Sequence, residues 1–173
     1  AADPLAIGAL MDLLKEAAAP VAIVGGAGWC GGASSHFREF AERIGIPVAV
    51  AFRRQDAIPN DSPAYAGNLG YGPTPKLVER IKAADLLLVA GPRLGEATTD
   101  GYTLVTPDHP DQLLVHVHPD PEELGRVYRT DLPICADMFE FAELCSDWEE
   151  EVISFSSGAE ATGPLGWMTV LRW

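Results

Sequence analysis

The sequence has few basic residues and lacks long apolar runs. Lys and Arg together number 12, against 25 Asp and Glu, and the formal net charge is −13 at pH 7. Proteins that hold nucleic acid or anionic membranes use clustered Lys and Arg, so we expect neither as a partner. No apolar run in the sequence approaches the roughly 20 residues needed to cross a bilayer, which argues against a membrane-spanning protein.

Cysteine is also scarce. Cys30, Cys135 and Cys145 are an odd number at scattered spacings, without the paired spacing of zinc sites or redox motifs. This usage favours a reducing compartment, and we expect a cytoplasmic protein. The chain begins Ala1-Ala2-Asp3-Pro4, with neither an initiator Met nor a basic leader, and this start is typical of a piece of a longer polypeptide.

The remaining composition indicates one soluble α/β domain. Strand-length apolar runs alternate with segments of helical period, a pattern typical of a three-layer, mostly parallel, Rossmann-like sheet with helices on both faces. The expected strands are 21–24, 47–52, 86–90, 113–117 and 132–135, with a short sixth at 65–67.

Capping residues predict where the helices begin. Asp3-Pro4 and Thr74-Pro75 each pair an N-cap with a proline at the first helical position. Asp120 and Asp137 resemble capping boxes. We expect the helix after Asp120 to point Leu124 and Val127 inward, and the last helix to continue through an acidic stretch, 140–151. A further helix is expected to end at Gly45 and to bury Phe37, Phe40, Ala41 and Ile44.

A glycine-rich turn follows the first expected strand. Gly26, Gly28 and Gly31 satisfy the G-x-G-x-x-G spacing between a strand and a helix. Such glycines either admit a phosphate to the helix N-terminus or permit tight packing, and the sequence does not decide between these interpretations. Arg53 and Arg54 stand where an NAD site has an acid, which would suit the 2′-phosphate of NADP.

Other polar residues give weaker indications. His116 and His118 alternate on one strand and point to one face, as two metal ligands would, but no third ligand can be named. Ser34-Ser35-His36 lacks the nucleophile elbow of a hydrolase, and Cys30 fits a small residue filling a turn. We therefore predict no metal site and no catalytic residue in this chain.

The chain carries, in order, the segments Pro20 to Gly26, Ile46-Pro47-Val48, Asp85 to Arg93, His116 to Gly125, and Ala136-Asp137. Taken together they resemble the central domain of thiamine-diphosphate-dependent enzymes of the acetolactate synthase type. That family has a glycine-rich turn after the first strand, an ADLLLxxGxR strand, an IHIDIDPxEIG segment and a GD pair near the last strand. On this resemblance, residues 1–152 form the central domain, and 153–173 form a linker or tail toward a missing C-terminal domain.

The resemblance implies a six-stranded sheet of the deoxyhypusine-synthase-like type that binds NAD or FAD in some proteins. It also implies flanking N- and C-terminal domains that carry the activating glutamate and the magnesium-binding Gly-Asp-Gly motif, which this sequence lacks. Thiamine diphosphate and magnesium are thus expected in the parent lyase or transferase, which would act on 2-oxo acids or related substrates as a homo-oligomer. We expect neither cofactor in this chain.

The resemblance further implies a site for FAD or ADP in this domain. Two departures weaken it, because Leu94-Gly95-Glu96-Ala97 replaces an Asp-Asp-Arg run and His118 replaces an acid. We therefore expect an empty or vestigial site. Carried over by position, its contacts would be Gly25, Gly26, Phe52, Arg53, Leu69, Gly70, Tyr71, Gly91, Arg93, His118 and Asp137.

Three functions follow from these observations. The first is a non-catalytic central domain of a thiamine-diphosphate enzyme. The second is an NADP-binding Rossmann-type module of an oxidoreductase, indicated by the glycine turn and Arg53. The third is an interaction domain whose acidic last helix meets a basic partner.

Overall fold

The computed structural model describes residues 2–148 and shows one six-stranded sheet in which every strand pair is parallel. The strand order is β3-β2-β1-β4-β5-β6, so the chain builds outward from β1 in one direction and from β4 in the other. The strands are β1 (Pro20–Val24), β2 (Val48–Val50), β3 (Tyr65–Asn68), β4 (Leu86–Ala90), β5 (Leu113–His118) and β6 (Leu132–Cys135). The expected α/β fold with a parallel Rossmann-like sheet is confirmed.

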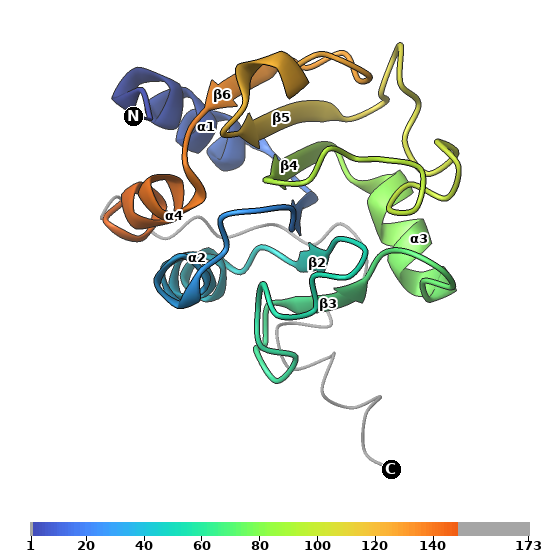
Figure 1. Ribbon diagram of the computed structural model, residues 1–173, viewed down its shortest axis with the longest axis horizontal. Helices are drawn as coiled ribbons and strands as arrows, with labels where there is room; N and C mark the ends of the chain where they lie inside the picture. The colour runs from blue at the N-terminus through green and yellow to red at the C-terminus, as the bar shows by residue number, and fades with distance from the viewer. Residues whose placement is uncertain (1, 149–173) are drawn as a thin grey trace.

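The sheet lies between two unlike layers (Figure 1). One face packs against α1 (Pro4–Glu16), α2 (Gly31–Ile44) and α4 (Met138–Ser146), with Leu10, Phe40 and Phe141 fully buried. The other face packs against α3 (Pro75–Ala83) and the irregular chain between β4 and β5, which contributes Leu94, Leu104 and Val105. The alternating strand residues supply both cores, as a sheet buried on two faces requires.

The capping residues begin the helices where the sequence predicted. Asp3 accepts a hydrogen bond from Leu5 N, Thr74 from Leu77 N, and Asp137 from Phe139 N. Each satisfies one of the backbone N–H groups left free at a helix start. Helix α2 ends at Gly45, whose φ of 75° is the left-handed conformation that glycine adopts without strain.

Two expected helices are shorter than predicted. After Asp120 only a 3₁₀ turn forms, η1 (Pro121–Glu123), and Val127 is exposed instead of inward. Gly125 has a φ of 76°, which breaks the helical path. Helix α4 ends at Ser146, and Arg43 donates hydrogen bonds to the carbonyls of Cys145 and Trp148. Residues 149–151 of the expected acidic helix and the expected tail 153–173 lie outside the described residues.

Strand β2 is also shorter than predicted, because the chain turns away after Val50 toward Arg53, which has a φ of 61°. The expected sixth strand is present as β3, at the sheet edge beside β2. None of the helices in residues 2–148 has the length and apolar character that a membrane span requires.

Candidate functional site

The candidate residues meet at one edge of the sheet because every strand is parallel. Each strand's carboxyl end lies at this edge, which is where ligands bind in open α/β sheets. All eleven predicted contacts lie at or just after a strand end: Gly25 and Gly26 after β1, Phe52 and Arg53 after β2, Leu69, Gly70 and Tyr71 after β3, Gly91 and Arg93 after β4, His118 at the end of β5 and Asp137 after β6.

The turns after β1 and β4 touch each other at the centre of this edge. A Cβ on Gly26 would overlap the carbonyl of Gly91, and a Cβ on Gly91 would overlap the carbonyl of Gly25. The φ angles of Gly26 and Gly91 are 70° and 90°, which L side chains rarely adopt. Backbone packing between the two turns therefore already requires glycine at both positions.

Trp29 lies over the same point. Its indole Nε1 donates to the carbonyl of Gly25 at 2.7 Å and lies 3.3 Å from that of Ala90, and the side chain is buried against Phe37. The crevice between β1 and β4, where strand order reverses, is the usual site of a dinucleotide. Here an indole binds the carbonyls at the ends of both strands, and sequence analysis gave Trp29 no role.

Aromatic and arginine side chains follow β2 and β3. Phe52 and Tyr71 make an edge-to-face contact at 5.2 Å, and Gly70 lies so close that a Cβ would come within 2.7 Å of the Phe52 ring. Tyr71 and Arg53 are exposed and open to a ligand, whereas Leu69 is fully buried in the core. Leu69 therefore offers a ligand no side-chain surface.

The two histidines of β5 lie side by side, with ring centroids 6.0 Å apart. His116 Nε2 is 3.0 Å from the carbonyl of Pro92 and must donate to it, because a carbonyl only accepts. Burial lowers the pKa of His116, and the nearby His118 acts in the same direction. His118 Nδ1 accepts from Asp120 N at 3.1 Å. No group of three His, Cys, Asp or Glu side chains within residues 2–148 is placed to hold a metal ion.

Sequence analysis missed an ion cluster next to these histidines. Glu123 is buried, and its Oε1 lies 2.6 Å from Arg126 Nη1 and 3.5 Å from Arg93 Nε. The cluster ties the segment after β4 to the 3₁₀ turn η1. Arg93 is consequently not free to meet a phosphate without competition from Glu123. The sequence offered no means of identifying this cluster, because nothing distinguishes the buried Glu123 from the other Asp and Glu residues, which number 25 in all.

Several of the polar side chains at this edge already have partners within the protein, whereas backbone N–H groups at the start of α2 are open to a ligand. Asp137 caps α4 and Arg93 pairs with Glu123, while the start of α2 at Gly31 and Gly32 is exposed. Free N–H groups at a helix start attract an anion, but the gain is only about 0.3–1 kcal/mol at an exposed position. A nucleotide bound here would need further contacts, and exposed Arg53 and Tyr71 lie at the same edge.

Residues 7–144 match the protein family described as "Thiamine pyrophosphate enzyme, central domain". The chain is 39% identical over 87 residues to sulfoacetaldehyde acetyltransferase of Alcaligenes xylosoxydans xylosoxydans, covering 50% of this chain and 14% of that protein. It is 32% identical over 126 residues to acetolactate synthase of Mycobacterium avium (73% and 20%) and 29% identical over 134 residues to a probable acetolactate synthase large subunit of Methanocaldococcus jannaschii (78% and 22%).

The chain thus spans between 14% and 22% of the length of these curated relatives. The family match runs from α1 into α4 and so includes all six strands. These matches give no support to the NADP-binding oxidoreductase alternative.

Proposed function

This chain belongs to the family of thiamine pyrophosphate enzyme central domains, and from that premise we propose that it is a non-catalytic domain of a larger acetolactate synthase-like enzyme. The single observation that carries the proposal is the family match over residues 7–144, combined with coverage of only 14% to 22% of the relatives. The remainder of such a protein would provide flanking domains. The parent enzyme would act on 2-oxo acids or related substrates.

Thiamine diphosphate and magnesium would bind to the flanking domains of the parent. The resemblance assigns the activating glutamate and the Gly-Asp-Gly motif to those domains, and this sequence contains no Gly-Asp-Gly. The central domain would lie between these two flanking domains and would supply contacts to both. The three cysteines are free in the structure, which supports a cytoplasmic parent. Homo-oligomeric assembly of the parent is part of the same proposal.

The FAD or ADP site of this domain would be vestigial. Trp29 occupies the crevice between β1 and β4, and Glu123 already pairs with Arg93. The indole of Trp29 is bonded to backbone carbonyls and Arg93 is paired with Glu123, so a nucleotide would have to displace contacts that the protein already makes. The exposed residues Arg53 and Tyr71 and the start of α2 are the surviving elements of such a site.

Two measurements test this proposal. The chain, mixed with thiamine diphosphate, Mg²⁺ and pyruvate, should leave pyruvate unconsumed, and turnover of any 2-oxo acid by the chain alone would disprove the non-catalytic assignment. FAD fluorescence should show no saturable change up to a concentration of about 0.1 mM, which as a dissociation constant corresponds to roughly −5.5 kcal/mol of binding free energy. Saturable binding that Arg93→Ala abolishes would show that the nucleotide site is functional.

The parentage has its own test. The reading frame around this sequence should encode an upstream domain with a suitably placed glutamate and a downstream domain with Gly-Asp-Gly. The longer polypeptide should bind thiamine diphosphate in the presence of Mg²⁺. A flanking sequence without either motif would contradict the proposed parent enzyme.

A further inference from the structure

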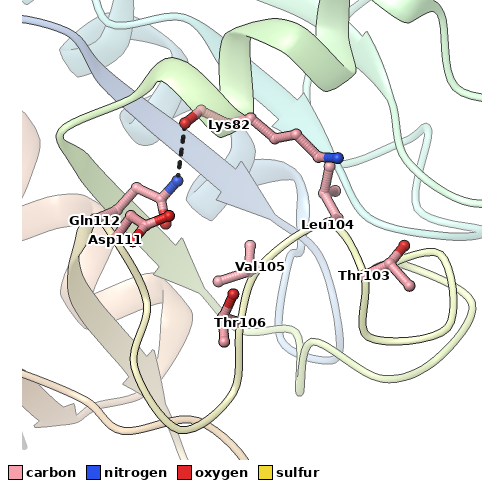
Figure 2. A pocket seen from close by; sticks show the side chains of 7 residues that line it. All are labelled: Lys82, Thr103, Leu104, Val105, Thr106, Asp111 and Gln112. Carbon is pink, nitrogen blue, oxygen red and sulfur yellow. Dashed lines mark hydrogen bonds between the residues drawn. The ribbon is translucent and has the colours of Figure 1, made fainter.

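A polar pocket lies at the amino edge of the sheet, opposite the candidate site. Its volume is about 240 Å³. Figure 2 shows that its walls come from the end of α3, the irregular chain before β5 and the two residues that precede β5. The lining residues are Lys82, Thr103, Leu104, Val105, Thr106, Asp111 and Gln112.

Gln112 makes one wall of this pocket rigid. Its side chain is 5% exposed, and its Nε2 donates to the carbonyls of Ile81 at 3.1 Å and Lys82 at 3.3 Å. These carbonyls belong to the last turn of α3, and that of Ile81 also accepts from Ala84 N at 3.3 Å. The amide therefore fixes the end of α3 to the start of β5, and the pocket exists without a ligand to order it.

The pocket carries two opposite charges that do not neutralise each other. Lys82 and Asp111 are both exposed, and neither forms an ion pair with another residue in the part of the chain that the structure describes. In Figure 2 the ammonium of Lys82 and the carboxylate of Asp111 lie on opposite sides of the pocket. Buried Leu104 and Val105 add an apolar wall between them.

We propose that this pocket binds a small zwitterion, with the ligand's anionic group at Lys82 and its cationic group at Asp111. The volume is below the roughly 300–1,000 Å³ of pockets for drug-sized ligands. A pocket of this size suits a ligand with a short aliphatic skeleton. A cation or an anion alone would leave the opposite charge of the pocket unmatched.

The affinity should be modest and the selectivity clear. Exposed ion pairs contribute little individually, so we expect dissociation constants in the range of about 1 mM. Selectivity would come from the placement of the two charges on opposite sides of the pocket, next to the wall that Gln112 holds in place. The ligand would bind far from the glycine turns, since the pocket opens at the amino ends of β4 and β5.

A chain-length series of ω-amino acids tests the proposal on the full chain. Glycine, β-alanine, 4-aminobutanoate and 6-aminohexanoate are titrated while amide NMR shifts are followed. One length should give saturable shifts that are strongest at Thr103 to Thr106 and at Asp111 and Gln112. Butanoate and butylamine serve as single-charge controls and should bind at least about fivefold more weakly. Equal binding of either control would overturn the zwitterion assignment.

Matched variants locate the two charges. Lys82→Met and Asp111→Asn should each weaken binding of the preferred ligand by about fivefold or more. Lys76→Met, at the other end of α3, and Asp108→Asn, in the same irregular segment, lie outside the pocket lining and should leave binding unchanged. Absence of saturable shifts up to about 20 mM, or an equal loss in the control variants, would overturn the proposal.

Discussion

Gly91 shows how one residue can be required by its neighbours as well as by its own backbone. Its φ is 90°, and a Cβ there would overlap the carbonyl of Gly25 and come within 2.9 Å of Trp29 Nε1. Gly45 also has a positive φ, 75°, but a Cβ there would meet nothing within 4 Å. The two glycines therefore share the conformational demand and differ only in the space around them.

This contrast predicts the outcome of Gly→Ala substitutions. Both variants introduce strain from a positive φ, about 1–2 kcal/mol. Gly91→Ala additionally overpacks the contact with Gly25, which costs roughly 1–3 kcal/mol. Urea unfolding should therefore show Gly91→Ala to be less stable than Gly45→Ala by about that second amount. Equal losses would show that the turns separate readily and that Gly91 has no packing role.

His116 predicts a pH dependence of stability. Burial, aided by the nearby His118, lowers the pKa of His116, while the hydrogen bond to Pro92 and the charge of Glu123 oppose that shift. Since the folded-state pKa is below the ordinary value of 6.5, the unfolded chain is protonated first as the pH falls. The stability that neutral His116 contributes is complete above about pH 6.5 and is lost as the pH falls through the folded-state pKa.

The measurement is the free energy of unfolding from pH 8 to 5 for the natural chain, His116→Gln and His109→Gln. His116→Gln keeps a donor for the carbonyl of Pro92 but cannot be protonated, so it should lose less stability than the natural chain below about pH 6.5. His109 is exposed, and its variant should follow the natural curve. A steeper acid loss in His116→Gln would contradict the assigned direction of the pKa shift.

At the scale of elements, the helix starts were predictable because their signals are local. The caps at Asp3, Thr74 and Asp137 each use a side chain that bonds a backbone N–H two or three residues later. The prediction of a helix after Asp120 was wrong, because Gly125 adopts a positive φ that ends the helical path. Capping describes how a helix begins and carries no information on where it ends.

The cap of α4 gives a prediction for one element. Asp137 accepts from Phe139 N at 2.8 Å, and α4 packs closely on α2. Asp137→Ala should lower the free energy of unfolding by about 0.5–2 kcal/mol, because the backbone N–H of Phe139 loses its capping acceptor. Asp137→Asn retains an acceptor and should lose much less in the same urea experiment. Equal losses in the two variants would mean that the charge, not the cap, is what matters.

The candidate site was predictable only in part. Strand ends placed all eleven residues at one edge, because parallel strands share a direction. No local pattern predicts the remaining contacts. Gly26 and Gly91 are far apart in the sequence, and the hydrogen bond from Trp29 to Gly25 depends on the path of an irregular turn. Whether these residues bind a nucleotide stays a prediction.

At the scale of the whole molecule, the two cores share one sheet. Along β1, Ala22 and Val24 pack with α1, α2 and α4, whereas Val21 and Ile23 pack on the face that holds α3. Losing either core would expose the alternate residues of the same strands, so the cores are expected to unfold together.

Phe40→Ala and Ile81→Ala test this coupling from opposite faces. Phe40 lies in the core beneath α2, and Ile81 lies in the core beneath α3. Each truncation should cost about 2–5 kcal/mol, and each should shift one transition seen identically by tryptophan fluorescence and circular dichroism. Two separate transitions in either variant would show that the faces unfold independently.

The position of β1 has a consequence for synthesis on the ribosome. β1 is the second element of the chain, yet it is central in the sheet and pairs with β4 through contacts such as Pro20 to Leu86. Parallel pairing at such sequence separation forms slowly, and translation delivers β1 well before β4. Nascent chains that end before β4 therefore carry an apolar strand with one flank unpaired, and holding them soluble is a task for chaperones.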